Sequence, residues 1–137
     1  MPMELKYLPD GGVLMKANGF VTFKDIKDVN DEIYGSEEKI LSISYQLCDF
    51  TNVKGFPLSS EEVKTIAEQD KYASQINPEM VIATIGELDV IYGLSRMWQA
   101  FTDGSPIKTK VFRNMADAEK WIKDEMGKNN SEGGEKD

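Results

Sequence analysis

The fold of this chain is decided by the stretch Met80-Val81-Ile82-Ala83-Thr84-Ile85-Gly86 and the segment that follows it. The apolar run predicts a strand buried on both faces, and Gly86 ends that strand. In residues 87–102, apolar side chains recur at helical spacing. Residues 103–106 predict a turn, and residues 107–112 predict a second strand. A strand, a helix and a strand joined by short loops predict one crossover of an open α/β sheet.

Segments on both sides of this unit complete the predicted sheet. The turn Pro9-Asp10-Gly11-Gly12 separates two strand-like segments and predicts an opening β-hairpin. The predicted strands are residues 5–8, 13–17, 39–50, 80–85 and 107–112, and the predicted helices, with their caps, are residues 22–35, 59–77, 87–102 and 114–127. The order β-β-α-β-α-β-α-β-α predicts an α/β fold with an open mixed sheet of about five strands and about four helices.

Length and composition predict a globular protein. The 137 residues are 40% hydrophobic and 29% charged, which is typical of one domain, and we place it at residues 1–127. Residues 128–137 are polar and lack periodicity, so they predict a disordered tail. No apolar run approaches the ~18 residues of a membrane span, and the first residues lack the apolar core of a signal peptide. We therefore expect a cytoplasmic protein without a membrane span.

Charge and residue types exclude several functions. The net charge of −8 disfavours binding to nucleic acid or to an anionic membrane surface. The chain has no histidine and a single cysteine, Cys48, so the usual general base, a disulfide framework and a thiolate zinc site are absent. Gly86 is followed by Glu87 and Asp89, the wrong charge for a phosphate-binding loop. We expect no catalytic residue, metal site or cofactor, and no enzymatic activity.

One face of the predicted helix at residues 87–102 carries candidate binding residues. Asp89, Tyr92 and Arg96 are spaced three and four apart, so they lie on one helix face. Tyr92 and Arg96 are placed to stack, and Gly93 allows close approach of another molecule. Two interpretations stay open. The face is either a solvated helix surface or a recognition surface for a partner or ligand, formed by Asp89, Tyr92, Gly93, Arg96 and Met97.

Three motifs and the element order carry a family resemblance. The most specific motif is Asp89-Val90-Ile91-Tyr92-Gly93-Leu94-Ser95-Arg96-Met97-Trp98. Gly19-Phe20-Val21-Thr22 precedes the first helix, and Val111-Phe112-Arg113 precedes the last. Over roughly residues 3–126 the chain resembles the STAS-like family of anti-sigma-factor antagonists, most closely its stand-alone bacterial, SpoIIAA-like branch of unassigned function. The resemblance implies a SpoIIAA-like fold and a non-catalytic regulatory module that binds proteins.

The same resemblance draws attention to two serines. Regulatory antagonists of the family carry a phosphorylatable serine in an Asp-Ser-Ser-Gly-like motif at the start of the second helix. The matching stretch is Pro57-Leu58-Ser59-Ser60-Glu61, which lacks the preceding acidic residue and has Glu61 in place of the glycine. The carboxylates of Glu61 and Glu62 would repel a phosphate, although a helix N-terminus favours one. Ser59, with Glu62 at capping-box spacing, is a candidate helix cap, and Ser59 and Ser60 are candidate phosphoacceptors.

Two kinds of binding partner fit these observations. The first is a protein, including a second copy of the chain in a homodimer, bound through the helix at residues 87–102. The second is a small apolar ligand or lipid in a pocket beside that helix, with Tyr92, Met97 and Trp98 in the pocket wall. The lipid-carrying CRAL-TRIO proteins, which have a similar topology, place such ligands under mobile helices.

Overall fold

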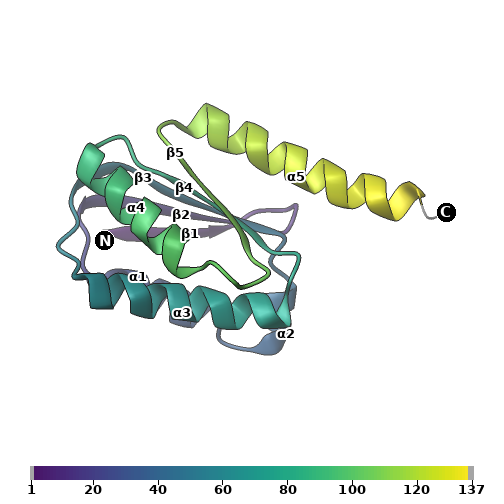
Figure 1. The fold of residues 1–137 in the computed structure, drawn as a ribbon, viewed down its shortest axis with the longest axis horizontal. Helices are drawn as coiled ribbons and strands as arrows, with labels where there is room; N and C mark the ends of the chain where they lie inside the picture. The colour runs from purple at the N-terminus through teal and green to yellow at the C-terminus, as the bar shows by residue number, and fades with distance from the viewer. Residues whose placement is uncertain (1, 136–137) are drawn as a thin grey trace.

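The structure of the protein is a computed structural model that describes residues 2–135, with side chains described as far as residue 128. These residues form a five-stranded sheet and five helices (Figure 1). The strands are β1 (Met3–Tyr7), β2 (Gly12–Phe20), β3 (Tyr45–Gly55), β4 (Val81–Ile85) and β5 (Lys108–Phe112). The helices are α1 (Phe23–Ile33), α2 (Glu37–Leu41), α3 (Ser60–Ile76), α4 (Asp89–Phe101) and α5 (Met115–Glu135). The predicted α/β class is confirmed.

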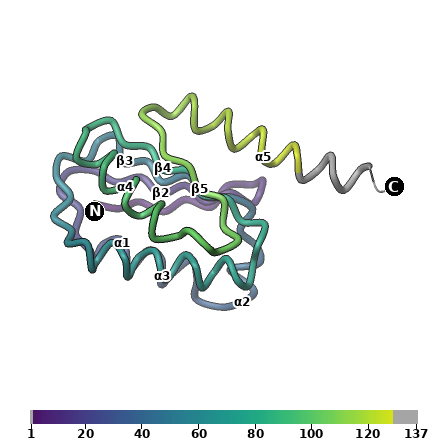
Figure 2. The backbone as a smooth tube through the Cα atoms, viewed as in Figure 1, coloured from purple at the N-terminus to yellow at the C-terminus, as the bar shows by residue number. Residues whose placement is uncertain are grey.

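The strands lie in the sheet in the order in which they occur in the chain, β1-β2-β3-β4-β5. Figure 2 traces the backbone through the sheet to helix α5. β1 pairs with β2 antiparallel, as the predicted hairpin requires, and β2 to β5 are all parallel. Parallel crossovers are nearly always right-handed. Successive crossovers that advance in the same direction therefore place their helices on one face of the sheet.

The two faces of the sheet are covered differently. Helices α1, α3 and α4 enclose the larger core, which contains Met15, Cys48, Ile82 and Trp98. Helix α5 lies on the opposite side of the sheet, where its residues Ala118 and Ile122 pack against β3 and β4 (Figure 1). All five residues of β4 are consequently buried, which confirms the predicted strand with both faces covered.

Side-chain caps begin three of the helices where the sequence predicts them. Thr22 caps α1 through a reciprocal pair of hydrogen bonds with Asp25, and Ser59 caps α3 in the same way with Glu62. The Asn114 side chain accepts a hydrogen bond from the Asp117 amide at 2.9 Å at the start of α5. Each cap satisfies amide groups that have no partner within the helix.

Several predicted boundaries are wrong, among them the end of β2, which lies at Phe20 and not at residue 17. The segment predicted as the start of a strand at residue 39 belongs to the short helix α2, because the Ser36 side chain accepts a hydrogen bond from the Lys39 amide at 3.1 Å. β3 begins later, at Tyr45, and ends at Gly55. Helix α5 does not end at Gly127, which lacks the positive φ of a helix-terminating glycine. The disordered tail at residues 128–137 stays a prediction, and residues 136–137 lie outside the described part of the chain.

Candidate binding site on and beneath helix α4

A tight turn places α4 against the sheet. β4 ends at Ile85 and α4 begins at Asp89, and a Cβ atom at Gly86 would lie 2.9 Å from Cγ2 of Ile91. Only glycine allows the first turn of α4 to approach the strand this closely. The residues of α4 that are buried are Ile91, Ser95 and Trp98.

The opposite side of α4 carries apolar side chains that are exposed to solvent. Val90 is 59% exposed and Met97 is 37% exposed. Between them Gly93 is exposed, and the position of a Cβ atom there has no neighbour within 4 Å. We call Val90, Gly93 and Met97 the outer strip. It contains two of the predicted binding residues and adds Val90, which the sequence analysis did not select.

The predicted partner of Tyr92 is replaced by another arginine. Arg113, not Arg96, lies over the Tyr92 ring, with Cζ 4.0 Å from the ring centroid. The Arg113 Nη1 atom donates to Oδ1 of Asp89 at 2.8 Å and to the carbonyl oxygen of Glu87 at 2.9 Å. Such exposed contacts contribute only about 0.5–1 kcal/mol each. They fix the Tyr92 side chain at the N-terminal end of α4.

Strand register explains why Arg113 reaches this position. Ile85 of β4 is paired with Phe112 of β5, and the Gly86 amide donates to the Phe112 carbonyl at 2.9 Å. The carboxyl ends of the two parallel strands therefore meet, and the residue after β5 lies beside the start of α4. Arg96 lies elsewhere, in a shallow groove that it lines with residues of β5 and with Trp121 of α5.

The two candidate phosphoacceptors lie at the N-terminus of α3. The Oγ atom of Ser59 accepts a hydrogen bond from the Glu62 amide at 3.1 Å, and the Ser59 amide donates to the Glu62 carboxylate at 2.9 Å. Ser60 is the first residue of the helix, and both serines are exposed. The capping role of Ser59 is confirmed, while phosphorylation of Ser59 or Ser60 stays a prediction.

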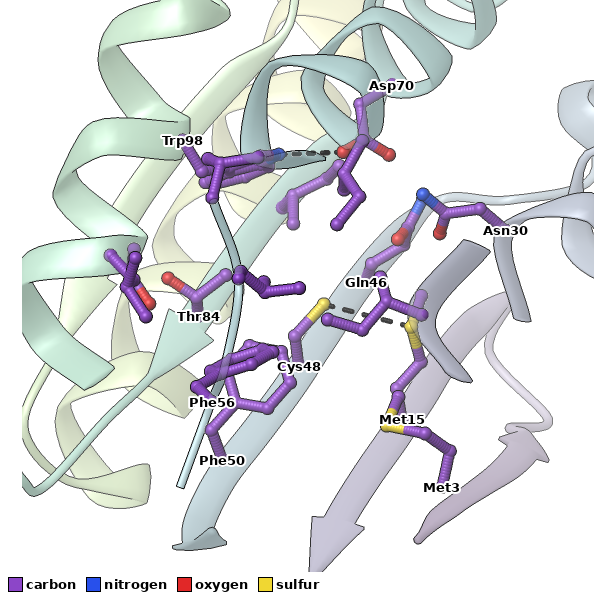
Figure 3. A pocket seen from close by; sticks show the side chains of 17 residues that line it. Met3, Met15, Asn30, Gln46, Cys48, Phe50, Phe56, Asp70, Thr84 and Trp98 are labelled. Atoms are coloured by element: carbon purple, nitrogen blue, oxygen red, sulfur yellow. Dashed lines mark hydrogen bonds between the residues drawn. The ribbon is translucent and has the colours of Figure 1, made fainter. Parts of the chain in front are cut away.

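A cavity of about 60 Å³ lies beneath α4, between the sheet and helices α1, α3 and α4 (Figure 3). Of the three residues expected in a pocket wall, Trp98 lines the cavity, whereas Tyr92 and Met97 do not. The helical repeat of 3.6 residues explains the difference, because it directs Leu94, Ser95 and Trp98 toward the sheet together. The apolar lining consists of Met3, Met15, Ile26, Phe50, Phe56, Leu58, Val63, Ile66, Ile82, Leu94 and Trp98.

A buried carboxylate joins the elements around this cavity. Tyr34, at the end of α1, donates to Oδ1 of Asp70 at 2.7 Å, and the Trp98 indole donates to Oδ2 at 2.8 Å. The Gln46 side chain of β3 donates in turn to the Tyr34 hydroxyl at 2.7 Å. Burial raises the pKa of the Asp70 carboxyl to about 6, although the donors Tyr34 and Trp98 oppose the shift. The sequence analysis did not find this network.

Asn30, Cys48, Thr84 and Ser95 also line the cavity, and Cys48 and Thr84 have unusual environments. Burial raises the pKa of the Cys48 thiol well above its usual range, so the sulfur stays protonated and behaves as a core side chain. Thr84 of β4 is 4% exposed, and its Oγ1 atom has no hydrogen-bond partner among the described residues. An unpaired buried hydroxyl costs about 1–3 kcal/mol, so Thr84 is an unusual feature of this core.

Within residues 2–128, whose side chains are described, no group of three or more acidic, cysteine or histidine side chains is placed to hold a metal ion. In the same part of the chain, none of the helices is both long enough and apolar enough to cross a membrane.

Comparison with known proteins identifies the fold. No family model matches the sequence, and no curated protein is a significant match. The solved structure of the anti-sigma factor antagonist SpoIIAA in its unphosphorylated form is similar, with a TM-score of 0.56 and 8% sequence identity. The match covers 88% of this chain and 96% of the SpoIIAA chain. The mixed five-stranded sheet, its helices and this match together show that the chain has the STAS-like fold.

Proposed function

We propose that this protein is a cytoplasmic, non-catalytic STAS-like regulatory module that binds a protein partner through the outer strip of α4. The structural likeness to SpoIIAA, an anti-sigma factor antagonist, supports a module of this kind. The protein partner proposed here includes a second copy of the chain, which would form a homodimer. The proposed domain comprises residues 1–127.

The uncovered outer strip is the observation that carries the proposal. Val90, Gly93 and Met97 are spaced three and four apart, so the outer strip is continuous along α4. Gly93 leaves room for another molecule to approach closely. Asp89 and Arg96 are exposed beside the outer strip. An apolar centre with a charged rim is the usual composition of a protein interface. A solvated helix face would not need apolar residues at these positions.

Val90→Asp is expected to weaken the complex at least about tenfold, because a carboxylate would lose its hydration in the interface without gaining a partner. Arg96→Ala, at the rim, should have a smaller effect. Both side chains are exposed, so the free energy of unfolding should change little. Self-association is measured by sedimentation velocity, and other complexes by crosslinking in cells from a photoreactive residue at position 97.

The control is the same photoreactive residue at Leu41 of α2, which is 61% exposed and remote in sequence from α4. Equal crosslinking from positions 41 and 97, or a complex that Val90→Asp leaves intact, would contradict the proposal. A variant that loses both binding and thermal stability would show that the strip serves the fold instead.

The cavity supports a second candidate function, the binding of a small apolar ligand. Its lining is mainly apolar and contains aromatic and sulfur-containing side chains, which adapt to varied ligand shapes. The two functions use different sides of α4, so each is tested separately.

A further inference from the structure

The unpaired hydroxyl of Thr84 lies at the cavity (Figure 3). Thr84 occupies a strand whose other residues are Val81, Ile82, Ala83 and Ile85, all of them apolar. Valine has nearly the same shape as threonine and would fill this position without burying a hydroxyl group. The Thr84 oxygen can both donate and accept a hydrogen bond. The hydroxyl itself exposes almost no surface, so only a polar atom packed directly against Thr84 can pair with it.

The charge around the cavity restricts what that group can be. Within the described residues no lysine or arginine lines the cavity, whereas the buried carboxyl of Asp70 does. An anionic head group would find no counter-charge and would face this carboxyl. Both Asp70 oxygens already accept hydrogen bonds, from Tyr34 and Trp98. Asp70 thus has partners without a ligand and Thr84 has none, which favours a neutral polar group.

The size of the cavity and the position of its mouth restrict the rest of the molecule. The space of about 60 Å³ holds only a few non-hydrogen atoms. For comparison, a cavity of ~150 Å³ binds benzene. Every lining residue is buried except Phe56, Leu58 and Leu94, which are half-buried. These three apolar side chains mark an opening between the loop before α3 and helix α4. The hydrocarbon part of a ligand would meet apolar side chains there.

We infer that the cavity binds a small, neutral, mainly apolar molecule with one hydroxyl or carbonyl oxygen that hydrogen-bonds to Thr84 Oγ1. The hydrocarbon part of this ligand leaves between Phe56, Leu58 and Leu94. This inference rests on the second candidate function and does not depend on the outer strip of α4.

Four probes of equal chain length test the ligand class: hexanol, chlorohexane, hexanoate and hexylamine. They are titrated into the full-length Trp121→Phe variant, in which Trp98 is the remaining tryptophan and lines the cavity. Hexanol should change the Trp98 emission saturably. Chlorohexane lacks the hydroxyl and hexanoate is anionic, so both should bind about tenfold more weakly, which corresponds to ~1.4 kcal/mol.

Thr84→Val tests the assigned hydrogen bond. It should reduce hexanol affinity about tenfold, to the level of chlorohexane, and leave chlorohexane affinity unchanged. Thr109→Val is the matched control, because Thr109 lies on the neighbouring strand β5 and does not line the cavity. This control should bind hexanol as the parent does.

The possible failures are distinguishable. Tighter binding of hexanoate or hexylamine, or hexanol affinity that survives Thr84→Val, overturns the inference and keeps the apolar-ligand function. If none of the probes binds, the inference and the apolar-ligand function both fail, and the cavity holds only water.

Discussion

Replacement of Trp98 by alanine is expected to lower the free energy of unfolding by about 5 kcal/mol. Removal of a buried tryptophan side chain costs about 3–5 kcal/mol through lost burial and the remaining cavity. The Asp70 carboxylate also loses the indole donor that is 2.8 Å away, which adds about 1–3 kcal/mol. Because small domains are stable by only about 5–15 kcal/mol, this variant will be close to unfolding. Urea denaturation followed by circular dichroism measures the change.

Two matched variants separate the contributions to this loss. Trp98→Phe keeps most of the packing but removes the donor, so it should cost about 1–3 kcal/mol. Trp121 of α5 is half-buried and packs against Phe112 with ring centroids 5.8 Å apart. Trp121→Ala should therefore cost clearly less than Trp98→Ala. If the two alanine variants are equally stable, Trp98 does not have the structural role assigned to it.

Asp70 is expected to make the protein less stable as the pH rises from about 4 to about 6. The carboxyl has a pKa of about 6 in the folded protein, above its ordinary value of 3.8. Between these values the native state holds a proton that the unfolded state has released, so stability falls with increasing pH and levels off above pH 6. At about 1.4 kcal/mol per pH unit, the loss is about 3 kcal/mol.

Asp70→Asn removes this ionisation, so its stability should lack the decrease. The experiment is a series of urea denaturation curves for the parent and the variant, from about pH 4 to about pH 7. The difference in the free energy of unfolding between them should change by about 3 kcal/mol in favour of the variant. A constant difference across this range would refute the assignment.

Glu125 should give a pH dependence of stability opposite to that of Asp70. Hydrogen bonds from Lys128 and Lys108 lower the pKa of its carboxyl. Its ion pairs therefore stabilise the fold at neutral pH and lose their effect as the pH falls and the carboxyl is protonated. Glu125→Gln should destabilise the protein at neutral pH and have little effect in acid. Because both ammonium groups are largely exposed, the effect should be below about 1 kcal/mol.

Sequence patterns over a few neighbouring residues correctly predict the buried strand β4 and the start of helix α3. The run at residues 80–85 is apolar throughout because both sheet faces are covered there. The capping box of Ser59 and Glu62 involves only neighbouring residues, so it was readable as well. Helix α2 was missed because its five residues are too few for periodicity to show. Only its cap, Ser36, marks its start.

The cavity and the Arg113 contact depend on residues far apart in the chain. Asp70 lies at helical spacing from Val63, Ile66 and Ala73, so its place on the buried side of α3 was a signal that the sequence analysis did not use. The identity of its donors follows only from how three helices pack. Likewise, the position of Arg113 beside Tyr92 requires the register of β4 and β5, which no short motif specifies.

The agreement between strand order and chain order bears on how the protein folds as it leaves the ribosome. Each new strand pairs with the strand synthesised just before it. Every pairing therefore brings together only the two ends of the segment between consecutive strands. The sheet can grow outward from the N-terminal hairpin during synthesis. Helix α5 comes after all the strands, and until it docks, Leu47, Val81 and Ile85 lack their cover. That face of the nascent sheet is the one most exposed to aggregation and to capture by chaperones.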